Sequence, residues 1–580
     1  MICGAKEQRI ASFSKYQHLK TSPNSLFTNK FVNLSLDLKM NKMSRVFSRI
    51  VSSTLLAVAT LATITTKAAE RPRLIVNIVV SSMHADDLQR YAEGFSGGGF
   101  RLLAEGGALC TESRYNYMQT TTPVSLATLS TGAMPSTHGV VSLRWTDYID
   151  NKMIDLTIDK SVSGLEQREG KGGHSPRNLI APTLTESAYK ADSCSRIITI
   201  ATDPVSAVVM GGRKGYSFWI DEERCRWTTS SYYTPYLPTW VKDYNSEKMP
   251  TLITSSVWKS IYPADRYRNS RQSTISVMNS NGRYSRKNAG SNEFINNYGR
   301  LSRTPVGNAA IFDFAKYAVI GLNLGKDEHP DILNICLDPA RKIASRYGNE
   351  SVEYEDMLYA LDRELSSFLG YIRTFVKNDE ALLVVLTSDH GTSPAYNHDQ
   401  SPKERFNVRQ FEVIVNAFLG AKYGQGEWVL GYIDHSIYLN HNLVYEKNLS
   451  IAEVQNEVAT FAMQFRGVSH ALSSTAMRMS YFGSGYAQKM QNSFYPRRSG
   501  DVIINLMPEW IESHDNVVSM SGSMYGYDTH VPLIFWGAGI RPQRIDEPVC
   551  MTSVAPTTAR IAGIAEPAAS EGTAINIKQE

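Results

Sequence analysis

The chain has 580 residues, of which 42% are apolar, so it can bury a large core and is neither a disordered nor a fibrous protein. The formal net charge of +4 comes from the first segment, because residues 1–69 carry ten Lys or Arg and only two Asp or Glu. The remainder holds 50 basic and 54 acidic residues. This composition gives no support for binding nucleic acid.

The N-terminal segment has the organisation of a secretory signal peptide. Residues 43–49 are a basic start, residues 50–64 are an apolar run without charge, and residues 67–69 end in small side chains. The apolar run is shorter than the roughly 20 residues that cross a bilayer, so a membrane anchor is the weaker interpretation. We predict that residues 1–42 result from a start codon assigned too far upstream and that residues 43–69 are a signal peptide. We further predict a periplasmic or secreted protein without another transmembrane segment.

Short β-branched apolar runs alternate with helical patterns in the rest of the chain. A helix is predicted over Tyr354–Val376, and the clearest strands are predicted at Leu74–Val80, Ile197–Thr202, Ile332–Leu337, Ala381–Thr387 and Val531–Trp536. Buried strands separated by helices predict an α/β fold with a central, mostly parallel sheet and helices on both faces. Ligands bind at the carboxyl ends of the strands in such sheets, so functional residues are expected there.

Two stretches interrupt this alternation. Residues 230–307 are rich in Tyr, Trp, Ser, Asn and Arg, and they predict an insertion over the site. Its basic part, residues 266–303, either binds anionic glycans or phosphate or is a solvated loop. Residues 406–499 alternate strand and helix and predict a small α+β cap. We therefore predict one main domain over residues 70–580 that carries these two insertions.

Five cysteines follow the N-terminal segment, and none forms a CxxC pair, which argues against a zinc knuckle or a redox motif. One or two disulfides are expected in an oxidising compartment. Cys194 and Cys225 flank two strand-like runs, Arg196–Thr202 and Tyr216–Ile220. Antiparallel pairing of these runs would bring the two sulfur atoms together, whereas a crossover connection would separate them.

Two elements carry residues suited to metal or phosphoryl chemistry. Asp389-His390-Gly391 follows a predicted buried strand and offers a carboxylate and an imidazole, both good ligands for a divalent metal. Thr122-Pro123 opens a predicted helix with Thr122 as its N-cap. A hydroxyl there faces the positive end of the helix, which favours an attacking alkoxide or a bound phosphate oxygen. Taken alone, Asp389-His390-Gly391 is by default a structural turn, and Thr122 is equally compatible with a helix cap alone.

The segments around these elements resemble the PafA-type branch of the alkaline phosphatase superfamily and, more distantly, the nucleotide pyrophosphatases/phosphodiesterases. The resemblance extends over nearly the whole chain after residue 70 and includes the string Tyr527-Asp-Thr-His530-Val-Pro. It implies an alkaline-phosphatase-like fold, hydrolysis of phosphoric esters, two zinc ions and a Thr nucleophile. Thr122 is the position that matches this nucleophile.

Several positions that the resemblance assigns to metal ligands carry other residues here. Ser81 stands where the first strand of the family ends in a metal-binding Asp. Arg341 and Ser345 stand at the Asp and His of an Asp-x-x-x-His pattern, and Ser521 stands at a further His. His530 lies nearby in the sequence and is an alternative ligand for that last position.

The substrate contacts implied by the resemblance are also altered. Leu143 stands at an Asn that contacts the phosphoryl group, and Asp203 and Val205 stand at a Lys-x-Arg pair. Asp389 and His390 keep the residue types of the family, as Thr122 does.

A catalytic zinc ion generally needs three protein ligands and an open position, and Arg341 would repel a dication beside it. We hypothesise that Arg341 pairs with Asp389 instead. The sequence thus favours a pseudo-phosphatase without a cofactor that binds an anionic, glycan or protein ligand. The alternative is a phosphomonoesterase or phosphodiesterase that uses zinc, with Thr122 as nucleophile and ligands recruited from His530, Asp528 or His138.

Overall fold

The computed structural model describes residues 71–168, 170–255, 258–271, 297–395, 405–515 and 517–579. The predicted signal peptide, the segment before it and residues 272–296 of the first predicted insertion lie outside the described residues. No helix of the described ranges is long and apolar enough to cross a membrane.

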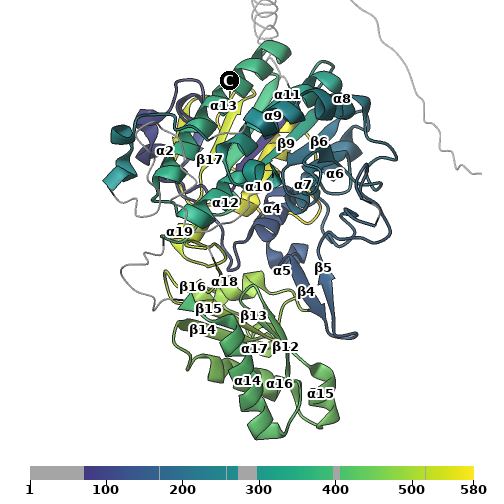
Figure 1. The fold of residues 1–580 in the computed structure, drawn as a ribbon, viewed down its shortest axis with the longest axis vertical. Coiled ribbons are helices and arrows are strands. Elements are labelled where there is room, and N and C mark those ends of the chain that lie inside the picture. Colours follow the sequence, from purple (N-terminus) through teal and green to yellow (C-terminus); the bar gives the residue numbers. More distant parts are fainter. Residues whose placement is uncertain are drawn as a thin grey trace, which may run out of the picture. The chain divides into compact units, whose positions relative to one another are not determined.

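Among the described residues, a nine-stranded sheet runs through the main domain in the order β18-β2-β17-β10-β1-β9-β6-β7-β8 (Figure 1). Its central strands are parallel, namely β10 (Leu382–Thr387), β1 (Leu74–Val80), β9 (Asp331–Leu337), β6 (Ile197–Ala201) and β7 (Tyr216–Ile220). β17 (Leu533–Gly537) pairs antiparallel with β10. It begins two residues later than predicted, after Pro532, because proline has no N–H for the ladder. The mostly parallel sheet confirms the predicted fold class.

Helices cover both faces of this sheet, which explains why β1 is buried along its whole length. On one face the core contains alternate β1 residues together with α11 (Pro305–Gly321) and α13 (Val352–Val376). On the other face it contains the intervening β1 residues with α4 (Thr122–Thr131), α7 (Pro204–Gly211) and α20 (Val554–Ala562). The predicted helix over Tyr354–Val376 therefore forms, two residues longer at its start.

Smaller elements connect and flank this sheet. They are α2 (Asp87–Arg90), α3 (Phe100–Gly106), β2 (Ala108–Cys110), β3 (Ser113–Arg114), α5 (Pro135–His138), β4 (Arg144–Asp147), β5 (Lys152–Asp155), α6 (Leu184–Ala191), β8 (Trp227–Thr228), α8 (Thr239–Glu247), α9 (Met249–Ser255), α10 (Asn297–Ser302), α12 (Asp338–Tyr347), α19 (Gly526–Thr529), β18 (Gln543–Ile545) and β19 (Val549–Cys550).

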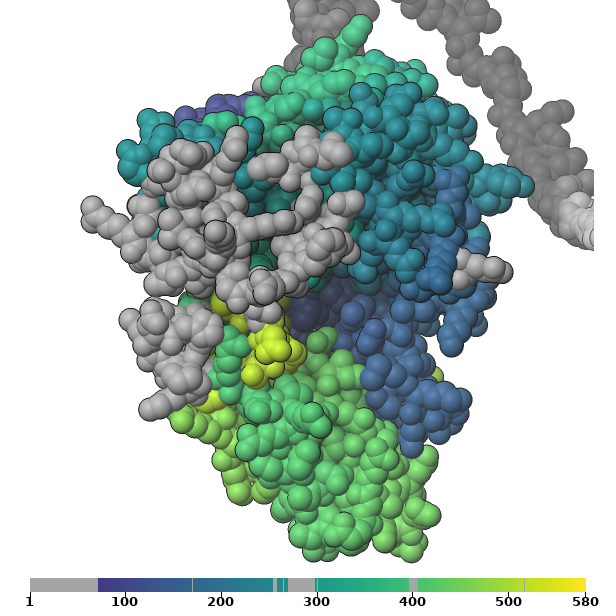
Figure 2. Space-filling model, in the orientation of Figure 1, coloured from purple at the N-terminus to yellow at the C-terminus, as the bar shows by residue number. Residues whose placement is uncertain are grey.

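Residues from β11 (Arg405–Phe406) to β16 (Ile511–Glu512) form a cap with its own apolar core. Its sheet has the order β12-β13-β15-β14 and antiparallel pairing. The cap elements are α14 (Val408–Tyr423), β12 (Val429–Ile433), β13 (Ser436–Leu439), α15 (His441–Glu446), α16 (Ile451–Ala462), β14 (Val468–Ser473), α17 (Ser474–Met479), α18 (Gly485–Ser493) and β15 (Val502–Leu506). The β4–β5 hairpin, blue in Figure 2, lies beside the green cap, and Tyr148 there donates to the Ser499 carbonyl at 2.7 Å.

The five cysteines after residue 70 are all unpaired. Of the two alternatives for Cys194 and Cys225, the structure has the crossover that separates them, because β6 and β7 pair in parallel with α7 between them. Cys194 precedes β6 at one edge of the sheet, whereas Cys225 follows β7 beyond the opposite edge. A parallel pair therefore separates the two sulfur atoms.

Candidate functional site

Asp389 and His390 lie directly after β10, at the carboxyl edge of the sheet, and each is 1% exposed. β1 is the parallel neighbour of β10, so its last residues reach the same edge. Ser81 Oγ donates to Asp389 Oδ2 at 2.8 Å, and the Ser82 amide donates to Asp389 Oδ1 at 3.3 Å. The buried carboxylate is therefore stabilised by two protein donors.

His390 is held in one tautomer. Its Nδ1 lies 2.6 Å from the Gly391 carbonyl oxygen, so this nitrogen carries the proton and donates it. Burial lowers the pKa of His390, with the Asp389 charge acting in the opposite direction. A Cβ on Gly391 would clash with the Tyr527 carbonyl, so only glycine allows this close turn. In the neutral ring, Nε2 is left as an acceptor.

Thr122 supplies the proton for that acceptor. Its Oγ1 lies 3.1 Å from His390 Nε2, and its side chain is 4% exposed. Thr121 is the N-cap of α4 and Thr122 is its first residue, so the predicted N-cap position is wrong by one residue. The Thr121 hydroxyl makes no capping hydrogen bond and is buried without a hydrogen-bond partner. Two threonine hydroxyls thus stand at the positive end of α4.

A hollow of about 260 Å³ opens in front of Thr122. Main-domain residues and cap residues line it together: Ser82, Thr121, Thr122, Pro123, Leu143, Arg341, Ser345, Thr392, Asp434, His435, Glu512, Ser519, Met520 and Ser521. Ser521 Oγ lies 3.5 Å from His390 Nε2. Four positions that the sequence marked as altered, at residues 143, 341, 345 and 521, therefore share one pocket with Thr122.

Arg341 pairs with Asp203 and not with Asp389, so the hypothesised pair is wrong. Arg341 Nη2 lies 3.5 Å from Asp203 Oδ2. Asp203 reaches it from the end of β6, where its other oxygen caps α7 by accepting from the Val205 amide. Asp389 is already bound by Ser81 and Ser82. The partner of Arg341 is thus the acid at the neighbouring strand end.

The guanidinium of Arg341 stays charged at this site. Burial acts to lower its pKa, but the charges of Asp203, Asp338 and Asp389 outweigh burial and raise it. Arg341 Nε is buried and makes no hydrogen bond. A second hollow, of about 670 Å³, also contains Arg341 and Ser345, and it includes the further basic residues Arg303, Lys342 and Arg346. Arg341 therefore lies where the two hollows meet.

Other predicted residues lie away from the pocket lining. Val205 is partly buried against the core. His530 Nε2 donates to the Thr111 carbonyl at 2.8 Å, and Asp528 accepts from the Ser523 amide at 2.8 Å. His138 lies in α5, 3.1 Å from Thr128 Oγ1, and burial lowers its pKa to about 3. These contacts occupy the three alternative ligands outside the residues that line the pocket.

The cap residues of the pocket were missed by the sequence analysis. Asp434 and His435 form the turn between β12 and β13, where both have positive φ. Asp434 accepts from Ser142 Oγ at 2.6 Å, and burial raises its pKa. Glu512 Oε1 is buried without a hydrogen-bond partner, 3.7 Å from His435 Nδ1. In the sequence, only the adjacent polar residues Asp434 and His435 indicated a turn here. They gave no indication that this turn lies near Thr122.

Three donors beside Thr122 lie at distances that suit one divalent ion. Asp389 Oδ2 and Thr122 Oγ1 lie 3.4 Å and 3.1 Å from His390 Nε2, close to the roughly 3.4 Å between two donors of a tetrahedral zinc ion. A second ion would meet the Arg341 guanidinium and the hydroxyls of Ser345 and Ser521. Zinc prefers thiolate, imidazole and carboxylate donors over hydroxyls and cationic groups.

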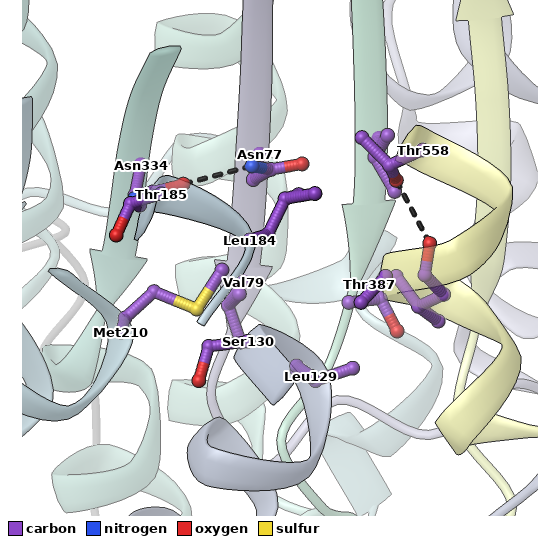
Figure 3. Close-up of a pocket in the computed structure, with 13 residues that line it drawn as sticks. Asn77, Val79, Leu129, Ser130, Leu184, Thr185, Met210, Asn334, Thr387 and Thr558 are labelled. Carbon is purple, nitrogen blue, oxygen red and sulfur yellow. Dashed lines mark hydrogen bonds between the residues drawn. The ribbon is translucent and has the colours of Figure 1, made fainter. Parts of the chain in front are cut away.

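A cavity inside the core does not add a ligand site. It lies between the sheet, α4 and α20, and its volume is about 10 Å³ (Figure 3). Asn77 Nδ2 donates to Asn334 Oδ1 at 2.8 Å, and Asn334 Nδ2 donates to Thr199 Oγ1 at 3.0 Å. This volume corresponds to one water molecule. The amide pair links three central strands.

The chain was compared with known proteins. The family model described as type I phosphodiesterase / nucleotide pyrophosphatase matches residues 75–528. Alkaline phosphatase PafA of Elizabethkingia meningoseptica is 27% identical over 519 residues, covering 88% of this chain and 95% of the relative. A Myroides odoratus protein named calcium-transporting ATPase is 28% identical over 525 residues, with 87% and 94% coverage.

A third relative and a solved structure agree with these matches. Alkaline phosphatase PhoV of Synechococcus elongatus is 25% identical over 517 residues, with 87% and 92% coverage. The crystal structure of wild-type alkaline phosphatase PafA superposes with a TM-score of 0.81 at 26% identity, covering 88% of this chain and 99% of that one.

Proposed function

Because the chain belongs to the type I phosphodiesterase / nucleotide pyrophosphatase family, within the PafA-type branch of the alkaline phosphatase superfamily, we propose that it is an exported pseudo-phosphatase. In this proposal the Thr122 pocket binds an anionic ligand and does not carry out two-zinc catalysis. The observation behind it is the donor set: Ser81, Ser345 and Ser521 offer hydroxyls and Arg341 a positive charge where two dications would need carboxylates and imidazoles.

The pocket is suited to a phosphate or similar group on a larger polar ligand. Arg341 presents a guanidinium whose Nε has no protein hydrogen bond, and such forks bind phosphate oxygens strongly. The hydroxyls of Thr121 and Thr122 stand at the start of α4, where the helix dipole favours an anion. The cap residues of the lining, Asp434 and Glu512, suit hydroxyl or amino groups. A phosphorylated glycan combines these features.

The names of the relatives favour a second candidate, a phosphoric ester hydrolase that uses one metal ion. Asp389 and His390 would hold the ion, which would supply positive charge for the developing oxyanion. Thr122 would attack phosphorus, and its hydroxyl already points to His390 Nε2 at 3.1 Å. Arg341 would take the place of a second cation, although Asp203 beside it would repel a phosphate dianion.

Hydrolysis measurements on the purified full chain separate the two candidates. We expect no turnover of p-nitrophenyl phosphate or bis-p-nitrophenyl phosphate, with or without added zinc, above that of the Thr122→Ala variant. Inorganic phosphate should bind to the wild type, bind similarly to Thr122→Ala and bind at least about tenfold more weakly to Arg341→Met. Zinc-dependent turnover that Thr122→Ala abolishes would instead establish the hydrolase.

Export rests on the basic, apolar and small-residue pattern of residues 43–69. Cell fractionation and N-terminal sequencing of the mature protein test it. Export predicts a new N-terminus close to residue 70 and absence from the cytoplasm, whereas a cytoplasmic protein that keeps residues 43–69 would contradict it.

A further inference from the structure

Cys194 lies in a group of side chains at the edge of the sheet opposite to Thr122. Among the described residues, one group of three His, Cys, Asp or Glu side chains has donor atoms that all lie within 4.8 Å of one another, and it consists of Asp192, Cys194 and His329. Asp192 and Cys194 precede β6, and His329 precedes β9. These strands are parallel neighbours, so the two loops meet at their amino ends.

Hydrogen bonds orient the three side chains toward one another. The Cys194 amide donates to Asp192 Oδ1 at 2.9 Å. The other oxygen, Asp192 Oδ2, lies 2.6 Å from His329 Nδ1. The His329 amide donates to Asp327 Oδ1 at 3.2 Å, which fixes the second loop. Cys194 is exposed and is not part of a disulfide, so its sulfur is accessible to a ligand from solvent.

The surrounding charges favour a cation at this place. Arg196 follows Cys194 by two residues, and its Nη1 lies 2.8 Å from Asp327 Oδ2 and 3.6 Å from Asp331 Oδ2. Two carboxylates thus neutralise this cation. The Asp192 charge and a Cys194 thiolate then remain available to a dication.

We propose that Asp192, Cys194 and His329 form a zinc-binding site, separate from the Thr122 pocket. Sulfur, imidazole nitrogen and carboxylate oxygen are the donors that zinc prefers, at about 2.3, 2.1 and 2.1 Å. Rotation of the partly exposed Asp192 and His329 side chains opens their 2.6 Å contact to the roughly 3.4 Å that a tetrahedral ion requires. Solvent occupies the fourth position. Binding releases the thiol proton, and the Nδ1 proton of His329 that faces Asp192 leaves to solvent from a charged ring or moves to Nε2 in a neutral one.

Cobalt titration of the full chain tests this site, because a thiolate bound to Co²⁺ gives a charge-transfer absorption band in the near ultraviolet. We expect one band that saturates at one equivalent and that added Zn²⁺ abolishes. Cys194→Ser should remove the band, and His329→Gln should weaken cobalt binding at least about tenfold, since even outer-shell changes have effects of that size.

Two matched variants serve as controls. Cys550→Ser removes another unpaired, partly exposed cysteine, and the double variant Asp389→Asn/His390→Gln removes the donors beside Thr122. Both should keep the cobalt band of the wild type, and thermal melts should show that all variants are folded. A band that survives Cys194→Ser, a band that disappears with either control, or no band at millimolar cobalt would overturn the zinc site.

Discussion

Ser81 Oγ donates a hydrogen bond of 2.8 Å to Asp389 Oδ2, so the end of β1 places a hydroxyl against the acidic side chain beside Thr122. Both residues are buried, at 3% and 1% exposure. The serine thereby stabilises the Asp389 charge from within the protein. With a serine at residue 81, the charge of Asp389 is stabilised by protein donors alone. With an Asp at residue 81, two adjacent carboxylates would need metal ions to neutralise their charge.

Removal of this hydroxyl should destabilise the protein. Ser81→Ala leaves a buried carboxylate with one donor fewer, so the free energy of unfolding should fall by about 2 kcal/mol. Urea unfolding at neutral pH measures it. Ser130→Ala is the matched control, because the Ser130 hydroxyl is also buried but donates to the neutral Ala127 carbonyl at 3.2 Å. An equal decrease in the free energy of unfolding for Ser81→Ala and Ser130→Ala would contradict a special role for the Asp389 charge.

A carboxylate at residue 81 should create affinity for zinc. In Ser81→Asp two acidic side chains face each other, so the variant should be less stable than wild type without metal and should regain stability with zinc. We expect zinc affinity at the pocket to rise at least about tenfold, as for the gain of a ligand. Melting temperatures with and without zinc measure this effect, and Ser81→Asn controls for size. An equal response of both variants to zinc would refute this prediction.

Arg341 should determine the affinity for phosphate. Arg341→Met removes a charged donor, and binding of inorganic phosphate should weaken at least about tenfold. Asp203→Asn should strengthen binding, because Asp203 competes for the same guanidinium at 3.5 Å. Isothermal titration calorimetry measures both variants. Unchanged affinity in Arg341→Met would place the anion elsewhere.

Stability should depend on pH through His138. Its pKa is about 3 in the folded protein because the ring is buried, whereas an unfolded His titrates near 6.5. The unfolded chain therefore binds more protons between these values. The stability that this neutral ring contributes is complete above about pH 6.5 and is lost as the pH falls toward 3, by up to about 1.4 kcal/mol per pH unit.

The variant His138→Gln tests this linkage. Urea midpoints measured between pH 7 and pH 4 should fall less steeply with acid in the variant than in the wild type. His470→Gln is the comparison variant: burial lowers the pKa of His470 too, but this side chain in β14 is only partly buried, so its effect on the pH profile should be smaller. Parallel pH profiles for His138→Gln and wild type would contradict the buried, neutral state of this ring.

The sequence predicted the central strands and the Asp389-His390 position because these features are local. β1, β9 and β10 are mostly apolar runs, and a buried run in an α/β pattern leaves few alternatives. The residues that follow β10 must then lie at the carboxyl edge of the sheet. Thr122 was placed beside them only by the resemblance to the PafA-type branch, which assigns the nucleophile to this position.

The partners of charged residues could not be predicted in this way. Arg341 pairs with Asp203 because β6 and β9 are neighbours, and sheet order is a property of the whole fold. Cys194 faces His329 and not Cys225 for the same reason. Asp434 reaches the pocket from a separate sheet in the cap, so only the tertiary arrangement shows its role.

The number of zinc ions bound beside Thr122 tests the central proposal most directly. Full-length Cys194→Ser protein, which lacks the surface site, is dialysed against micromolar zinc and analysed by mass spectrometry for metal. The proposal predicts that no zinc is retained in stoichiometric amount. Retention of one or two zinc ions per chain that are lost in a further His390→Gln variant would contradict it.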